Sequence, residues 1–225
     1  MNHSDEIFDI VDEQDRVIGN AGRREIHRRR LRHRAVHLFL FDNTGRLYIQ
    51  KRASTKGSFP GRFDSSASGH VDSGESYDAA VLRETRGEIG REFLPDELRG
   101  TFDSLSVVGR VTSRGEIARK TAASGAESDE TRFSANAAYK KTVVNGDSLR
   151  KHFQIAACEE TGQEFVWVYS ARGNYQPVFN PAEIESARFW TLPEIEHHLA
   201  AHPDDWAPAF RLIFREFQQR LLKSH

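Results

Sequence analysis

Two glutamates, Glu84 and Glu88, stand four residues apart in a stretch with helical character, and they could do chemistry together. On a helix, residues i and i+4 emerge on the same face, so the two carboxylates would lie side by side. Like charges at this spacing repel by roughly 0.2–0.5 kcal/mol unless a cation compensates them. Mg²⁺ takes oxygen ligands and keeps several waters, which leaves positions for phosphate oxygens. The pair indicates either a divalent-cation site or two carboxylates on a solvated helix face.

The residues around this pair have a specific spacing. It resembles the Nudix box, Gly-x5-Glu-x7-Arg-Glu-U-x-Glu-Glu-x-Gly-U, where U is apolar; the matching residues are Gly69, Glu75, Arg83, Glu84, Glu88 and Gly90. The resemblance covers about residues 7–99 and 149–222. It implies a Nudix-type α/β/α sandwich with a mixed sheet. It also implies Mg²⁺- or Mn²⁺-dependent hydrolysis of a diphosphate linked to another group.

Three positions depart from this pattern. Thr85 and Arg91 stand where apolar residues are usual, and Gly87 stands at the first position of the Glu-Glu pair, which in the family is commonly a metal ligand. A glycine inside a helix also costs about 0.5–1 kcal/mol relative to alanine. We therefore expect a metal site that has lost one carboxylate, with Glu164 on a later strand as a source of another oxygen.

A narrower resemblance is to the isopentenyl-diphosphate-isomerase-like branch of Nudix proteins. It lies in the stretches 33–41, 50–52, 59–64, 68–70 and 160–167. In true isomerases a catalytic cysteine stands directly before the Gly-His of the stretch that corresponds to residues 68–70. At that position this chain has Ser68. Serine is a far weaker acid than a thiol, so the resemblance favours a hydrolase on the isomerase scaffold over an isomerase. A degenerate Nudix domain that binds a ligand or a protein without turnover is the other alternative.

The resemblance and the side-chain chemistry together predict the site. Glu84 is the expected principal metal ligand, and it would also orient or deprotonate the attacking water. Glu88 is expected as a second ligand. Gly69 would offer its carbonyl oxygen to the metal, as in the family. Glu75 and Arg83 are expected to form an orienting salt bridge. The predicted substrate-binding residues are Arg52, Lys51, His33 and His70. Arginine suits phosphate through its planar fork of donors, and a surface salt bridge is an equally open alternative for Arg52. His33 and His70 are weaker candidates, since such histidines are more often satisfied or exposed without a catalytic role.

The surrounding pattern predicts the elements that must position these residues. Residues 7–12 read as a strand, residues 35–41 and 47–50 as a hairpin, residues 53–69 as a loop, and residues 76–89 as a helix that stops at Gly90. Further strands are expected at residues 153–157, 164–169 and 187–190, and helices at 192–199 and 208–222. Because strands and helices mix without a regular βαβ repeat, the class is α+β or mixed α/β.

One long segment differs in composition. Residues 100–148 are rich in Ser, Thr, Gly and Ala and poor in large apolar residues, so they bury too little surface to offset the entropy of ordering. We expect one Nudix-like domain over residues 1–225, interrupted by a poorly structured insertion at 100–148.

Composition narrows the functional class. Lys and Arg number 32 against 33 Asp and Glu, a balance that argues against a dedicated nucleic-acid binder. The single cysteine, Cys158, excludes an intrachain disulfide and a multi-cysteine zinc site. Neither a signal peptide nor an apolar run of membrane-spanning length stands out. We expect a cytoplasmic protein that acts on a small-molecule diphosphate, without a membrane partner, and a homodimer is left open.

Overall fold

The computed structural model describes residues 6–93, 98–99 and 149–222. These residues belong to one compact unit, formed by Met1–Thr101 and Val144–His225. The expected insertion at 100–148 lies outside the described residues, so its character stays a prediction.

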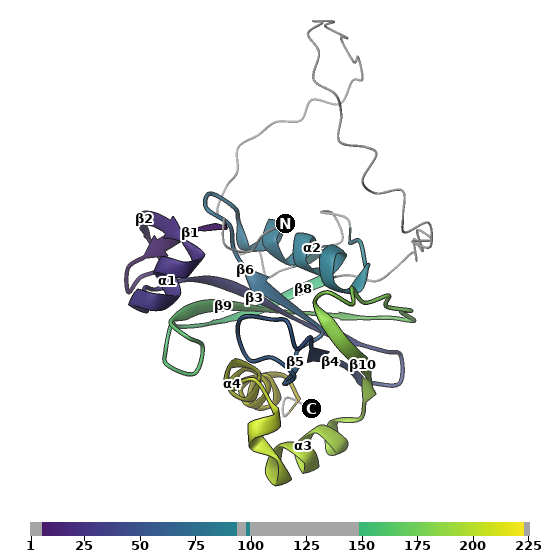
Figure 1. The fold of residues 1–225 in the computed structure, drawn as a ribbon. Helices are drawn as coiled ribbons and strands as arrows, with labels where there is room; N and C mark the ends of the chain where they lie inside the picture. The colour runs from purple at the N-terminus through teal and green to yellow at the C-terminus, as the bar shows by residue number, and fades with distance from the viewer. Residues whose placement is uncertain (1–5, 94–97, 100–148, 223–225) are drawn as a thin grey trace, which may run out of the picture. The chain divides into compact units, whose positions relative to one another are not determined.

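A mixed sheet forms the centre of this unit (Figure 1). Its strands run in the order β10 (Ile184–Trp190), β4 (Leu47–Arg52), β3 (His33–Phe41), β9 (Glu164–Arg172), β8 (Leu149–Ile155) and β7 (Leu98–Arg99). Two short strands lie off this path: β5 (Phe63–Asp64) pairs with β4, and β6 (Ala67–His70) pairs with β3. Strands β3 and β9 are parallel, whereas β3 and β4 are antiparallel, as are β8 and β9.

Alternation along β3 divides the core between the two faces of the sheet. Phe39 and Phe41 pack with α3 (Leu192–Ala201) and α4 (Pro208–Phe217). Leu38 and Leu40 pack on the other face with α2 (Tyr77–Ile89). Figure 1 shows α2 on one side of the sheet and α3 and α4 on the other. The expected α/β/α sandwich with a mixed sheet is therefore confirmed.

Helix α2 has the boundaries that its sequence predicts. The Ser76 hydroxyl accepts a hydrogen bond from Ala79 N at its start, and Gly90 ends it in the left-handed conformation, with φ of 64°. Thr85 is fully buried, and its Oγ1 donates to Val81 O at 2.6 Å. This hydrogen bond lets a polar side chain occupy a position where the box usually has an apolar one.

A separate N-terminal element lies beside the sheet. Strands β1 (Ile7–Val11) and β2 (Val17–Gly22) form a two-stranded antiparallel sheet, and α1 (Arg23–Arg29) follows directly. The expected first strand is confirmed. The arginine-rich segment 23–34 begins with this short helix. Arg30, the residue directly after the helix, has a left-handed φ of 53°.

Two expectations need correction. Residues 53–69 are not loop throughout, because they contain β5 and β6, whose short Ser- and Gly-rich sequences become strands by pairing with β4 and β3. The expected helix 208–222 is α4 only to Phe217, and a π-helical segment, Gln218–Leu222, continues it. No helix among the described residues is long and apolar enough to cross a membrane.

Candidate active site and histidine cluster

Glu84 lies directly against the backbone of Gly69. A Cβ atom built on Gly69 would lie 2.1 Å from Glu84 Cδ and 2.2 Å from its Oε1, closer than real Cβ atoms come to other atoms. Only glycine at position 69 therefore lets this carboxylate reach strand β6. Gly69 and Glu84 were both expected at the site, and the structure brings them into contact.

Glu88 lies deeper, with 3% of its surface exposed. Its Oε2 accepts hydrogen bonds from Ser68 N at 2.9 Å and from Gln50 Nε2 at 3.3 Å. Burial, and then the negative charge of Glu84, raise the pKa of Glu88 to about 8. Burial also raises the pKa of Glu84, against the lowering effect of Arg83. One buried and one half-buried carboxylate, both with raised pKa values, form an oxygen-rich set that a hard divalent cation would stabilise, so the residues fit such an ion.

Lys56 and Glu183 add a second cation and a third carboxylate to this region. The Lys56 ammonium forms an ion pair with Glu183, and both side chains are mostly buried. The charge of Lys56 lowers the pKa values of Glu84 and Glu88, whereas the charge of Glu183 raises that of Glu84. We call Glu84 and Glu88 the carboxylate cluster, with the Lys56–Glu183 ion pair as a separate pair whose charges act on it.

Arg83 connects several parts of the site. Its Nε donates to Glu75 Oε1 at 3.0 Å and its Nη2 donates to Glu75 Oε2 at 2.7 Å, so the expected Glu75–Arg83 salt bridge is present. The same Nη2 donates to His70 O at 2.9 Å, and Nη1 donates to Glu84 Oε1 at 2.5 Å. Arg83 therefore orients Glu84 and holds the end of β6.

Gly87 is exposed on α2, and a Cβ atom there would meet no described atom within 4 Å. A longer side chain at this position would therefore meet no steric barrier from the described residues. The absence of a carboxylate at position 87 is a property of the sequence and not a requirement of packing.

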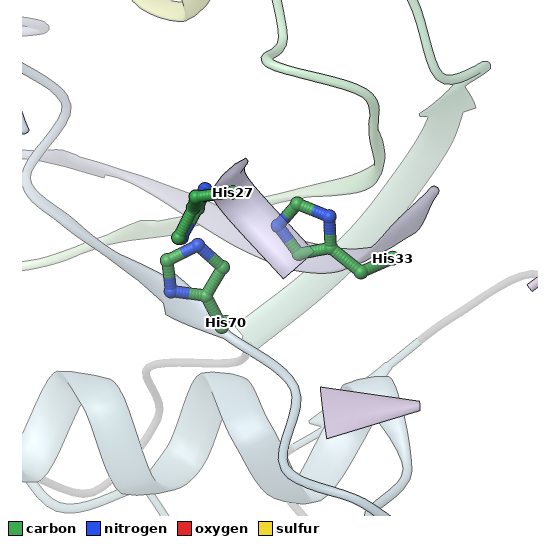
Figure 2. A group of neighbouring side chains, drawn as sticks. All are labelled: His27, His33 and His70. Carbon is green, nitrogen blue, oxygen red and sulfur yellow. The ribbon is translucent and has the colours of Figure 1, made fainter. Parts of the chain in front are cut away.

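Three histidines from three elements meet on the opposite face of β6. Along a strand, side chains alternate, so His70 points away from the side on which Gly69 meets Glu84. Figure 2 shows His27 of α1, His33 of β3 and His70 of β6 gathered together. One nitrogen from each ring lies within 4.8 Å of the others. We call His27, His33, His70 and the adjacent Glu164 the histidine cluster.

The imidazole nitrogens of this cluster are suited to bind a cation. His33 Nδ1 lies 2.9 Å from Leu31 O, and because a carbonyl only accepts, Nδ1 carries a proton toward that oxygen. The Nε2 atoms of His27, His33 and His70 are buried and make no hydrogen bond of good geometry among the described residues, although Glu164 lies near those of His33 and His70. Burial lowers the pKa of His70 to about 4 and also lowers that of His27, which keeps both rings neutral at pH 7.

Glu164 completes this arrangement. Its Oε1 lies 3.4 Å from His33 Nε2 and 3.1 Å from His70 Nε2. Burial alone would raise the pKa of Glu164, but the two imidazoles hold it well below its usual value, so the group is ionised. Phe8 stacks against the cluster, with its ring centroid 4.5 Å from that of His70. Three imidazoles and one carboxylate that meet at one place match a borderline transition-metal ion.

The two predicted phosphate-binding residues have other partners. Arg52 Nη1 donates to Asp64 Oδ2 at 3.0 Å and its Nε donates to Ser58 O at 3.1 Å, with little of the side chain exposed. Lys51 Nζ pairs with Glu185 at 2.7 Å on the surface. Arg52 thus forms a buried salt bridge and not the surface one given as its alternative, and its charge lowers the pKa of Glu88. Lys51 forms a surface salt bridge.

Sequence reasoning placed Glu164 with Glu84 and Glu88, and His33 and His70 with the substrate. The structure instead places all three in the histidine cluster. It also adds residues that no motif marked: His27 lies within the arginine-rich segment 23–34, Lys56 lies in the stretch 53–69 that the sequence predicts as a loop, and Glu183 lies outside every predicted element. Nothing in the sequence distinguishes His27 from the other histidines of the chain, because the three histidines that meet in the structure follow no regular spacing along the sequence.

Comparison with known proteins agrees with this architecture. Residues 31–122 match the family model of the NUDIX domain. An uncharacterised Nudix hydrolase of Streptomyces coelicolor is 47% identical over 95 residues, which are 42% of this chain and 52% of that protein. An isopentenyl-diphosphate Delta-isomerase of Photorhabdus laumondii is 44% identical over 86 residues, 38% of this chain and 49% of that protein. The match thus spans about half the length of these curated relatives.

Similarity over nearly the whole chain is lower. A Nudix hydrolase of Deinococcus radiodurans is 29% identical over 219 residues, 95% of this chain and 96% of that protein. The crystal structure of a Deinococcus radiodurans protein superimposes with a TM-score of 0.59 at 24% identity, covering 88% of this chain and 90% of that one. This structural likeness shows a shared fold.

Proposed function

We propose that this chain is a metal-dependent hydrolase that cleaves the diphosphate linkage of a nucleoside- or isoprenoid-type diphosphate. The match of residues 31–122 to the NUDIX domain model supports this proposal. The main support for the proposal is that the Glu84 carboxylate lies against the backbone of Gly69, next to the buried Glu88. Together these residues offer oxygen ligands at a point where the raised pKa values make a divalent cation favourable.

In this proposal Glu84 and Glu88 hold Mg²⁺ or Mn²⁺, and the Gly69 carbonyl is a third ligand. Such an ion neutralises phosphate charge and lowers the pKa of bound water when it is present. Arg83 keeps Glu84 in place through its bonds to Glu75 and His70 O. Glu84 also orients the attacking water, or takes its proton.

The Lys56–Glu183 ion pair adds charge beside a site that lacks a carboxylate at Gly87. Glu183 comes from a different segment of the chain, and its negative charge raises the pKa of Glu84. Lys56 balances the cluster and supplies an ammonium donor for a phosphate oxygen, the role first assigned to Lys51 and Arg52.

The histidine cluster is proposed as a second cation site of different chemistry. Its imidazole nitrogens favour Mn²⁺, Co²⁺ or Zn²⁺ over Mg²⁺, which prefers oxygen. Glu164, His33 and His70 would then be ligands of this second ion and not groups that bind phosphate. The buried Nε2 atoms, which make no hydrogen bond of good geometry among the described residues, support this assignment.

A panel of diphosphates with Mg²⁺ or Mn²⁺ tests the hydrolase. We expect release of phosphate or monophosphate, and a fall of at least about a hundredfold in rate for Glu84→Gln, the scale seen when a preorganised electrostatic group is lost. An equal rate in this variant would place the chemistry elsewhere.

The same panel separates the two alternatives. Metal-dependent binding of a diphosphate without any turnover would identify a degenerate domain. A shift of the double bond of isopentenyl diphosphate, followed by NMR, would identify an isomerase, which Ser68 disfavours because it replaces the cysteine of that activity.

A further inference from the structure

We propose that Gln50 is a positioning residue for the cation of the carboxylate cluster. Its side-chain amide holds one oxygen of Glu88, so that Glu88 offers the ion a single oxygen and the site favours Mg²⁺ over Ca²⁺. This inference rests on the proposed function, because it needs a divalent cation at Glu84 and Glu88. It adds ion selectivity to that site.

The backbone of Gln50 is fixed by a neighbouring strand on each side. Gln50 lies on β4, where it pairs with Ala187 of β10 and with Asp64 of β5. Its side chain is buried, with 1% of the residue's surface exposed, and it reaches Glu88 of α2. A side chain on such a rigid element keeps one position, which precise ligand geometry requires.

The hydrogen bond between Gln50 and Glu88 has a defined direction. Gln50 Nε2 donates to Glu88 Oε2 at 3.3 Å, and Ser68 N donates to the same oxygen at 2.9 Å. Because an ionised carboxylate only accepts, the amide nitrogen and not the amide oxygen must face it. Both donors therefore hold Oε2, whereas Oε1 makes no hydrogen bond to a described residue. Oε1 is thus the oxygen that Glu88 can offer to an ion.

A neutral donor suits position 50. The positive charges of Lys56 and Arg52 already act on Glu88. A further cation beside this carboxylate would repel a metal ion at the cluster. The amide of Gln50 instead holds the carboxylate by a hydrogen bond and adds no net charge. Gln50 therefore orients a ligand without competing with the ion.

A carboxylate that offers one oxygen favours the smaller cation. Mg²⁺ demands near-octahedral geometry at about 2.0–2.1 Å and keeps several waters, whereas Ca²⁺ takes about 6–8 oxygens at about 2.3–2.6 Å and accepts both oxygens of one carboxylate. Because Gln50 and Ser68 hold Oε2, Glu88 can give its second oxygen to Ca²⁺ only by losing these bonds. The two hydrogen bonds thus disfavour Ca²⁺ relative to Mg²⁺.

Calorimetric titration of the full chain with Mg²⁺ and with Ca²⁺ tests this inference, since both ions prefer oxygen to the imidazoles of the histidine cluster. Gln50→Met keeps the length of the side chain and removes the donor. Gln50→Asn keeps an amide but is one methylene shorter, so its nitrogen no longer reaches Oε2; it is the second variant if the first does not fold. Gln154→Met is the matched control, because Gln154 Nε2 also donates to a carboxylate, Asp15 Oδ2 at 2.7 Å, on a different strand.

We expect Gln50→Met to weaken Mg²⁺ binding about tenfold, the lower end of the loss when a partner of a metal ligand is removed, and to weaken Ca²⁺ binding less. The ratio of the two affinities should therefore fall, and Gln154→Met should leave it unchanged. An unchanged Mg²⁺ affinity, or equal losses for the two ions, would overturn the inference, and a lower melting temperature in EDTA with unchanged affinities would show a structural role only.

The wild-type titration separates this inference from the proposed function. If the wild type binds no Mg²⁺, or if Glu84→Gln binds it equally well, the proposed metal site is wrong, and the role of Gln50 fails with it. If the wild type binds Mg²⁺ through Glu84 and the Gln50 variants keep its ratio of Mg²⁺ to Ca²⁺ affinity, the role of Gln50 alone is wrong.

Discussion

Replacing Glu88 by glutamine tests whether a buried, protonated carboxyl forms the base of the carboxylate cluster. Glutamine keeps the size of the side chain and an oxygen that accepts from Ser68 N and Gln50 Nε2. Glutamine cannot carry the negative charge that burial and the neighbouring charge of Glu84 disfavour at this position. In the metal-free protein this change is expected to stabilise the fold at alkaline pH and to have little effect at acid pH.

The direction follows from the pKa values. Glu88 titrates at about 8 in the folded protein against a reference value of 4.5, so the folded state binds more protons than the unfolded state between these values. The contribution of Glu88 to stability is therefore greatest below pH 4.5 and is lost as pH rises toward 8. At 1.36 kcal/mol per pH unit the difference is at most about 4–5 kcal/mol. Glutamine does not titrate and removes this loss.

The assay is urea unfolding of wild type and Glu88→Gln at pH 5 and pH 8.5, each with EDTA and with saturating Mg²⁺. With EDTA, the stability advantage of the variant should grow by a few kcal/mol between the two pH values. With Mg²⁺ at pH 8.5, wild type should gain stability that the variant lacks, because the cation binds the ionised carboxylate of the folded state. Glu92→Gln, at an exposed position after α2, is the matched control. An advantage of equal size at both pH values would refute the assignment of a raised pKa to Glu88.

Three further predictions concern other parts of the molecule. Gly87→Glu should increase the rise in melting temperature that Mg²⁺ produces, because it adds a carboxylate and a better helix former at an open position. An unchanged rise would mean that position 87 does not face the cation. His70→Gln should abolish the visible absorption of Co²⁺ in the histidine cluster while leaving Mg²⁺ binding at Glu84 and Glu88 in place, and an unchanged spectrum would locate Co²⁺ elsewhere. Deletion of residues 100–148 with a short turn linker should leave a cooperative melt near that of the parent, whereas loss of folded protein would make the segment part of the core.

The sequence by itself predicts those elements that depend only on interactions between residues close together in the chain. The helix over Tyr77–Ile89 follows from a serine cap, a glycine stop and apolar residues at helical spacing, all within one short stretch. The same spacing places Glu84 and Glu88 on one face. The short strands β5 and β6 were missed because their residues have no strand pattern of their own and are extended only by pairing with neighbours.

Only the tertiary structure decided which side chains share a site. His33 faces Glu164 because β3 and β9 pair in that parallel register, and His70 joins them because β6 pairs Ala35 with His70. A shift of one residue in either pairing would turn one of these side chains to the opposite face of the sheet. Long-range register is set by the packing of the whole core, so no local motif could assign Glu164 to the histidines and away from Glu84.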